Sequence, residues 1–309
     1  MRLDNQRESS NVEDRRGDSS GGLGGGGYRQ AGMGIPLRGG SLVTIAVLVG
    51  IGWLVFGINP LQMLSMLTGG SGGSITQEDS YQPSSPRSTQ SSQNSGAQDS
   101  GKQFVAKVLG STEDVWTEIF AAGGKRYKPT PLVLFSGATG SACGTASSAT
   151  GPFYCPVDGK VYIDLAFYRE LRDRFGAPGD FAQAYVIAHE VGHHIQDLVG
   201  VLPEFNRQRQ QMSKAEANEM SVRVELQADC YAGIWANRTD KQGMLDPGDI
   251  DEALNAATQI GDDAIQKRSQ GYVVPDSFTH GTSAQRSAWF NRGYKTGRMD
   301  QCDTFSGSI

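Results

Sequence analysis

The stretch "VIAHEVGHHIQD" (residues 186–197) holds three of the four histidines in the 309-residue chain. It has the apolar spacing of a helix, and His189, Glu190 and His193 form an HExxH sequence within it. Positions i and i+4 of a helix lie one turn apart on the same face, so the two imidazoles can bind one Zn2+ ion together. Glu190, about 100° further round the helix, can take a proton from a water molecule on the open side of that ion. The stretch therefore predicts a helix that carries a catalytic zinc site.

The third neighbouring histidine, His194, is one position out of step with the two predicted ligands. It should point away from the metal, toward a packing surface or a backbone carbonyl. We therefore expect a structural role for His194. Asp180 can cap the start of the helix and Gly200 can end it.

A catalytic zinc site needs a third protein ligand besides two histidines. One known solution places glycine at 196 and histidine at 199, but this chain has Gln196 and Val199, which excludes that pattern. The other solution is a glutamate from a second helix. The strongly helical stretch 214–238 contains three glutamates, Glu216, Glu219 and Glu225.

Only Glu225 is followed at i+4 by an aspartate, Asp229, inside an otherwise apolar stretch. Two carboxylates on an apolar helix face are costly unless they are paired or bound to a metal. We therefore predict Glu225 as the third zinc ligand. Asp229 would accept the hydrogen bond of the non-coordinating N–H group of a ligand histidine. The alternative is that both residues form ordinary surface pairs with Arg223 or other bases.

The N-terminal part of the chain predicts a membrane anchor. Residues 1–40 are polar and rich in glycine, so we expect a disordered tail. The first 18 residues of the stretch 41–67 carry no charge, which is about the lower limit for a transmembrane helix. A cleaved signal peptide and a buried core helix are the alternatives, but some 40 residues precede the stretch and no A-x-A sequence follows it.

Basic residues give this predicted anchor an orientation. Six arginines precede it and the next basic residue after it is Arg87, so the positive-inside rule places the N-terminus in the cytoplasm and the remainder outside. Residues 68–102 have the composition of a flexible Gly/Ser/Gln/Pro linker, which leaves one domain at 103–309.

This domain predicts an α+β fold with a small sheet before a helical half. Residues 114–124 have the spacing of an amphipathic helix closed by glycine, 131–137 form a short apolar strand, and 160–168 alternate as a strand with one buried face does. Helices dominate from residue 179 onward. The net charge of −5 comes with no basic stripe, so we expect no nucleic-acid partner.

The four cysteines contain no close pair of the kind that structural zinc sites use. An even, well-separated set is typical of two disulfides in an oxidising compartment, and four reduced thiols are the alternative. Of the three pairings, we predict Cys143–Cys155, which closes a loop rich in glycine and serine, and Cys230–Cys302, which ties the C-terminal tail to the helix of Glu225.

HExxH followed by ExxxD resembles the gluzincin arrangement, and the chain as a whole is similar to the bacterial neutral zinc metallopeptidase family of the YpfJ type. The resemblance rests on five stretches: "MRLDNQRESSNVEDRRG" (1–17), "SACGTASSATGPFYCPVDGKVYIDLAFY" (141–168), "AHEVGHHIQ" (188–196), "ELQADCYAGIWA" (225–236) and "FTHGTSAQRSAWFNRGY" (278–294). It implies a zincin-like peptidase domain behind one N-terminal membrane anchor. It also implies zinc ligands at His189, His193 and Glu225, with Glu190 as the catalytic acid and base.

Gluzincins commonly use a late histidine or tyrosine to stabilise the oxyanion, and the resemblance gives this role to His280. Its loop precedes a helix whose start matches a capping box, Thr282 to Gln285. Tyr272 is a weaker candidate, and a solvent-exposed loop histidine is the alternative. The resemblance also makes the strand at 160–168 a candidate edge to which an extended substrate adds, and a core strand without substrate contact is the equal alternative.

These observations together predict a membrane-anchored zinc metallopeptidase that hydrolyses peptide bonds in a protein or peptide substrate. Its single N-terminal helix would lie in the bacterial inner membrane and its catalytic domain in the periplasm. One alternative is a non-catalytic, zinc-stabilised module that binds envelope proteins. Another is a zinc amidase that acts on cell-wall peptides.

Overall fold

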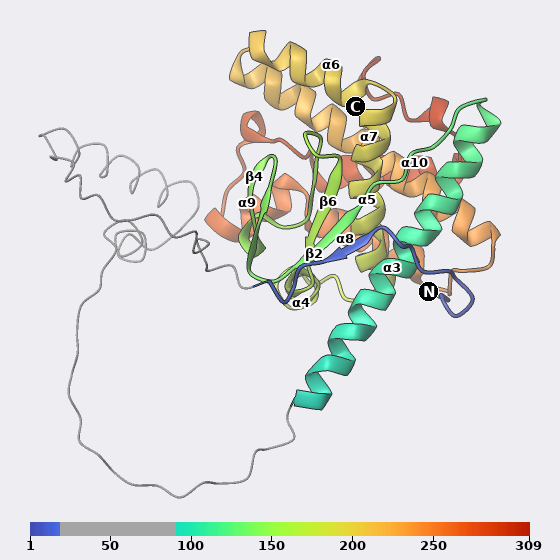
Figure 1. Ribbon diagram of the computed structural model, residues 1–309. Coiled ribbons are helices and arrows are strands. Elements are labelled where there is room, and N and C mark those ends of the chain that lie inside the picture. Colours follow the sequence, from blue (N-terminus) through green and yellow to red (C-terminus); the bar gives the residue numbers. More distant parts are fainter. Residues whose placement is uncertain (19–90) are drawn as a thin grey trace, which may run out of the picture. The chain divides into compact units, whose positions relative to one another are not determined.

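The computed structural model describes residues 1–18 and 91–309 (Figure 1). The predicted membrane anchor at 41–67 lies outside these ranges, as does most of the predicted linker. Within the described ranges, no helix combines the length and the apolar character that a membrane crossing requires. The described residues form one compact unit in which residues from both ends of the chain take part.

A four-stranded sheet has the order β1-β2-β6-β5. Strands β1, β2 and β6 are parallel, and β5 runs antiparallel to β6 at one edge. A separate hairpin consists of β3 and β4. The strands are β1 (Val12–Asp14), β2 (Leu132–Phe135), β3 (Ala138–Ser141), β4 (Gly144–Ser147), β5 (Phe153–Cys155) and β6 (Lys160–Asp164).

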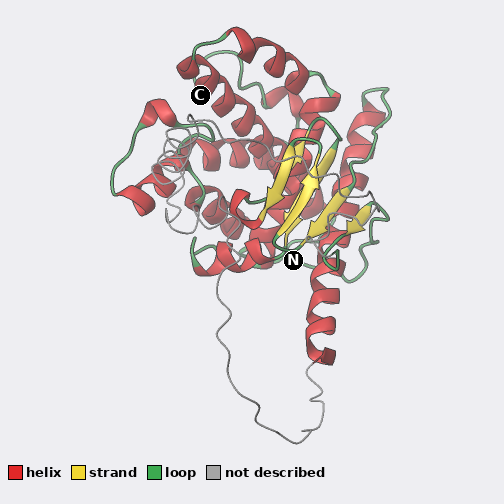
Figure 2. Cartoon of the chain, turned by 60° about the vertical axis from the view of Figure 1, so that its left-hand side comes forward, coloured by secondary structure: helices red, strands yellow, loops and turns green. Residues whose placement is uncertain are grey.

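Helices make up most of the described chain and lie beside and behind the sheet (Figure 2). The mixed α and β composition, with a small sheet before a helical half, confirms the predicted class. The helices are α3 (Ser91–Ala122), α4 (Ala166–Asp173), α5 (Asp180–Leu198), α6 (Val201–Gln208), α7 (Lys214–Lys241), α8 (Asp249–Gln259), α9 (Asp262–Gln270) and α10 (Ser283–Thr296).

The first residues of the chain depart from the prediction. Disorder over residues 1–40 is wrong for residues 1–18, which pack on the domain and supply β1 (blue in Figure 1). A three-residue strand has no periodicity of its own, and its stability comes from pairing with β2, more than 100 residues later. Helix α3 also begins at Ser91, so its first part lies within the predicted linker at 68–102.

The predicted strand at 160–168 is too long. Strand β6 ends at Asp164, and α4 begins at Ala166. Four consecutive β6 residues are buried, since α5 packs on one face of the sheet and the β3–β4 hairpin region covers the other. The strand is also interior, between β2 and β5, so the two edges of the sheet belong to β1 and β5.

Helix α5 lies at the centre of the domain, in contact with the sheet, α3, α7 and α8. Helices α7 and α10 approach so closely that glycine is required on both. A Cβ atom on Gly233 would lie 2.0 Å from the carbonyl oxygen of Phe290, and one on Gly293 would lie 1.9 Å from that of Cys230. This approach fixes the position of α10 against the helix that carries Glu225.

Both predicted disulfides are confirmed. Cys143, in the turn of the β3–β4 hairpin, is bonded to Cys155 at the end of β5. Cys230 of α7 is bonded to Cys302 in the C-terminal tail. The first bond holds the hairpin beside the edge strand, and the second holds the tail against α7.

Candidate metal centre

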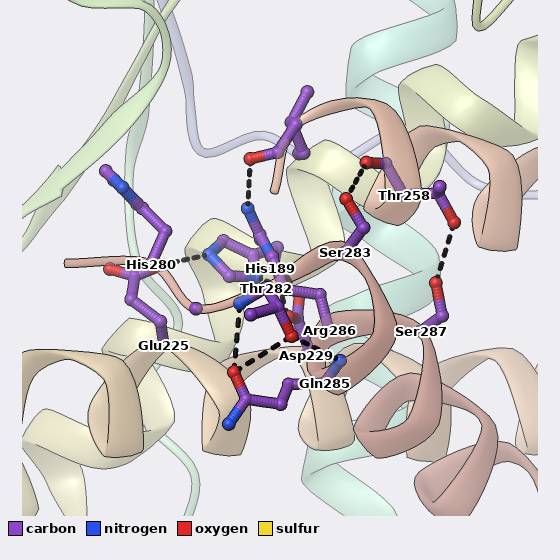
Figure 3. Close-up of polar contacts among 12 residues, drawn as sticks. His189, Glu225, Asp229, Thr258, His280, Thr282, Ser283, Gln285, Arg286 and Ser287 are labelled. Atoms are coloured by element: carbon purple, nitrogen blue, oxygen red, sulfur yellow. Dashed lines mark hydrogen bonds and ion pairs between the residues drawn. The ribbon is translucent and has the colours of Figure 1, made fainter. Parts of the chain in front are cut away.

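Helices α5 and α7 bring the predicted ligands together, and Figure 3 shows two of them, His189 and Glu225. His189 and His193 lie one turn apart on α5, with ring centroids separated by 4.8 Å. Glu225 of α7 faces both of them. Its Oε2 atom is 3.1 Å from Nε2 of His189 and its Oε1 atom is 3.4 Å from Nε2 of His193. The three donor atoms all lie within 4.8 Å of one another.

Hydrogen bonds on the far side of each ring determine which nitrogen faces Glu225. Nδ1 of His189 lies 2.8 Å from Oδ1 of Asp229, and Nδ1 of His193 lies 2.9 Å from Oε1 of Gln196. Each Nδ1–H donates to its oxygen acceptor, which leaves the Nε2 lone pair directed toward Glu225. Both imidazoles are therefore held in the tautomer that binds a cation.

This donor set fits zinc. Nitrogen and oxygen ligands about 2.1 Å from a tetrahedral Zn2+ ion lie roughly 3.4 Å from each other. Nε2 of His189 lies 3.1 Å from Oε2 of Glu225 and Nε2 of His193 lies 3.4 Å from its Oε1, so each imidazole has one carboxylate oxygen near that separation. Three protein donors also leave one tetrahedral position for water or substrate, as in catalytic zinc sites.

The charges of the buried groups favour a cation between them. Burial lowers the pKa of His189, but Asp229 and Glu225 outweigh it and raise that pKa to about 10. Burial raises the pKa of Glu225, yet the two histidines hold it well below its usual range. The cluster thus stabilises positive charge at its centre, and a divalent cation can supply that charge with both imidazoles neutral.

Glu190 lies beside this cluster and is free to act on another molecule. Its side chain is buried on the same helix and lines the same cleft as His189 and His193. Burial raises its pKa, and the neighbouring histidines oppose that shift. Within residues 1–18 and 91–309, no protein hydrogen bond engages its carboxylate.

Arg286 of α10 is a central residue that the sequence reasoning missed. Its Nε and Nη2 atoms lie 2.9 and 3.0 Å from the two oxygens of Asp229, and Nη2 also contacts the hydroxyl of Tyr185. Tyr185 in turn donates a hydrogen bond to Asp229. Arg286 and His189 hold the pKa of Asp229 at about 2, against the burial that would raise it. Asp229 is therefore an ionised carboxylate with a saturated set of partners.

Gln196 was also missed as a site residue. Its Nε2 donates to the carbonyl of Val224 and to the side chain of Gln227, which orients its Oε1 toward His193. An i+3 spacing from His193 was the signal in the sequence. For Arg286 there was no local signal, because it lies 57 residues from Asp229.

His280 lies in the loop before α10 and lines the same cleft as the metal cluster. The Asp262 carboxylate accepts hydrogen bonds from the backbone N–H groups of Thr279, His280 and Gly281, and it contacts the His280 ring at 3.1 Å. Burial lowers the pKa of His280, but Asp262 and Glu225 outweigh it and raise that pKa. Tyr272 is 63% exposed and is not among the cleft-lining residues.

The remaining candidates have structural roles. Nε2 of His194 donates to the carbonyl of Lys128 at 2.7 Å, as expected for a histidine that points away from the metal. Glu216 closes a capping box with Ser213, and Glu219 pairs with Arg223. Asp180 lies in the first turn of α5, and Gly179 takes the cap position.

The metal cluster lies in a cleft of about 620 Å³. Residues 151–154 of the β5 region form one wall, and apolar side chains such as Phe167, Leu202 and Phe205 form much of the rest. This volume is in the range of ligand-binding clefts.

Comparison with known proteins agrees with this geometry. The family model described as "Putative neutral zinc metallopeptidase" matches residues 1–305. The chain belongs to this family. It is 46% identical to the uncharacterized protein YpfJ of Escherichia coli over the full length of both chains. It is 43% identical to the uncharacterized protein Rv2575 of Mycobacterium tuberculosis, over 66% of this chain and 70% of that one. No solved structure matches.

Proposed function

We propose that the protein is a zinc-dependent peptidase with a zincin-like catalytic domain. The observation that carries the proposal is the convergence of three donor atoms, from His189, His193 and Glu225, with the free carboxylate of Glu190 beside them. Zinc held by these donors would act as a Lewis acid and make a water molecule acidic near neutral pH.

Glu190 is the proton acceptor in this proposal. Its buried carboxylate takes the proton of the attacking water and later passes it to the leaving amine. The raised pKa of Glu190 suits this role, because a base near the operating pH can both accept and release a proton. A site that only binds metal has no use for a further carboxyl group in this position.

His280 acts on the oxygen of the substrate carbonyl. Asp262 holds the His280 ring and three successive N–H groups of its loop. A protonated imidazole at the cleft wall can donate a hydrogen bond to the oxyanion that forms when water adds to a peptide carbonyl. Removal of such a donor costs about 3–4 kcal/mol of barrier.

The substrate is a protein or peptide in extended conformation. It adds to the free edge of β5 through backbone hydrogen bonds, while apolar side chains occupy the apolar part of the cleft. This assignment moves the substrate edge from the strand at 160–168, where the sequence placed it, to residues 153–155.

The test compares the wild-type protein with Glu190→Gln and His280→Ala. Each variant is loaded with zinc, its metal content is measured, and its cleavage of a peptide library and of cell-wall peptides is followed. We expect full zinc occupancy in all three, a loss of at least a hundredfold in turnover for each variant, and cleavage of library peptides. Equal turnover in the wild-type protein and Glu190→Gln would refute the peptidase proposal and leave a metal-binding module. Cleavage of cell-wall peptides alone would indicate an amidase.

A further inference from the structure

The first 18 residues belong to the same folded unit as the domain, although the apolar segment 41–67 separates the two in sequence. Strand β1 pairs with β2 in parallel, with Val12 opposite Leu132 and Asp14 opposite Leu134. Backbone hydrogen bonds continue on both sides of the strand, from the N–H group of Ser9 to Ala106 at 2.9 Å and from that of Arg15 to Leu134 at 2.8 Å.

A buried carboxylate of the domain depends on this N-terminal segment. Glu113 of α3 is only 4% exposed. Within the described residues, the partners of its carboxylate are the hydroxyl of Ser9 at 2.6 Å, the amide of Asn11 at 2.7 Å and the guanidinium of Arg7 at 2.9 Å. Residues 7–11 both cover this carboxylate and supply these hydrogen-bond and ion-pair partners, so their loss would remove all three contacts.

The domain surface is also shaped to receive this segment. A Cβ atom on Gly110 of α3 would lie 2.5 Å from the carbonyl oxygen of Arg7, so only glycine allows the backbones to meet there. Every residue of β2 is at most 1% exposed. Removal of β1 would leave an apolar strand at the edge of the sheet, which is a site for aggregation.

Four of the six arginines on which the predicted orientation rests lie in the described residues, and each of these four has a carboxylate partner there. Arg2 pairs with Asp246 at 2.8 Å, Arg7 with Asp114 at 2.6 Å and Arg15 with Glu13 at 2.7 Å. Arg16 pairs with Asp14. Arginines that neutralise carboxylates of the folded unit need no cytoplasmic location to explain them, so their weight in the positive-inside argument falls.

The length of the apolar segment then limits the topology. Its 27 residues carry no charge and suffice for one helical crossing of a bilayer, which takes about 20 residues, but not for two. One crossing would place residues 1–18 and 91–309 in different compartments, where β1 and β2 cannot pair. A second copy of the chain cannot supply β1 either, because its own residues 1–18 would also lie on the far side.

We propose that residues 1–18 and 91–309 lie on the same side of the membrane and that the apolar segment does not carry the chain across it. This topology replaces the single-pass orientation expected from the basic residues. It does not rest on the peptidase function. The two disulfides favour the oxidising side for both parts.

The experiment labels single introduced thiols in the full-length protein in cells. Ser10→Cys reports on the N-terminal segment and Lys125→Cys on the domain; both positions are exposed, and the four native cysteines are paired. A membrane-impermeant maleimide is added to spheroplasts, intact or lysed with detergent. We expect the same pattern at both positions: labelling of both in intact spheroplasts places them outside, and labelling of both only after lysis places them in the cytoplasm. Opposite patterns would overturn the proposal.

A second measurement tests the docking of the segment itself. Ser9 is buried and its neighbour Ser10 is exposed, so in native, lysed samples Ser9→Cys should react at least tenfold more slowly than Ser10→Cys. Gly110→Ala should remove most of that protection. Gly101→Ala, on the same helix, should leave it, because its Cβ atom would contact only the Leu165 side chain. Equal reaction rates at the two serine positions in the otherwise wild-type protein would show that the segment is not docked.

Discussion

Replacement of Arg286 by methionine tests the electrostatic reasoning about the metal centre most directly. Arg286 is 3% exposed and Asp229 is fully buried, and the two are joined by two short contacts of 2.9 and 3.0 Å. Methionine fills most of the volume and removes the charge, so the Asp229 carboxylate keeps only His189 and Tyr185 as partners. Removal of one partner from a buried ion pair costs about 3–5 kcal/mol.

We therefore expect Arg286→Met to lower the free energy of unfolding by about 3–5 kcal/mol, measured by denaturant titration of the metal-free protein. Asp229→Asn should cost a similar amount, because it leaves the guanidinium unpaired. The double variant should cost less than the sum of the two, with a coupling energy of about 2 kcal/mol or more. The matched control is Arg298→Met, whose ion pair with Asp300 is solvent-exposed, so this substitution should have little effect on stability.

Zinc binding gives a second readout of the same pair. Since Arg286 holds Asp229 and Asp229 holds His189, loss of the arginine should weaken zinc affinity by about 10- to 100-fold. A cost below 1 kcal/mol for Arg286→Met, or strict additivity in the double variant, would refute the view that Asp229 is held as a buried, compensated carboxylate.

Three further predictions follow from particular contacts. Gln196→Met should weaken zinc binding by about 10- to 100-fold in a competition titration, because His193 loses its hydrogen-bond acceptor, whereas Gln183→Met on the same helix should not. Gly233→Ala should cost more than about 3 kcal/mol in chemical denaturation despite its better helix propensity, because its Cβ atom would overlap the carbonyl of Phe290; an unchanged midpoint would contradict that close approach. The hydrogen bond from Arg16 holds the pKa of Asp14 at about 2, so the stabilisation by this carboxylate is complete above its unfolded value and is lost as pH falls from about 4 toward 2. The protection factors of the β1 amides in hydrogen exchange, which correct for the intrinsic rate at each pH, should fall over that range, and Asp14→Asn should remove the dependence.

The local features of the site could be predicted from the sequence because helix geometry makes them local. The i, i+4 spacing fixes His189 against His193 and Glu225 against Asp229 whatever the rest of the chain does. The direction of the His194 ring, away from the metal centre, and the capping box of Thr282 follow from the same kind of short-range rule. Facts of this kind need no knowledge of the tertiary fold.

Apart from Gln196, whose i+3 spacing from His193 was a local signal, the main misses are long-range. Strand β1 is three residues long, and nothing in its own composition distinguishes it from the polar tail in which it lies. Its stability comes from β2 and from Glu113, both more than 100 residues away along the chain. From the sequence alone, Arg286 could be a surface residue of α10. It is buried because α10 packs closely against α7 at Gly233 and Gly293.

These long-range contacts connect the parts of the metal centre. Helix α7 supplies Glu225 and Asp229, and α10 supplies the arginine that keeps Asp229 ionised. Because the glycines let the two helices meet at backbone distance, a change far from the metal can shift Arg286 and, through Asp229, the orientation of His189. The metal centre should therefore be sensitive to substitutions at the contact between α7 and α10 that touch none of its ligands. Gly293→Ala offers that perturbation. Zinc affinity should fall in this variant while its helix content stays close to that of the wild-type protein.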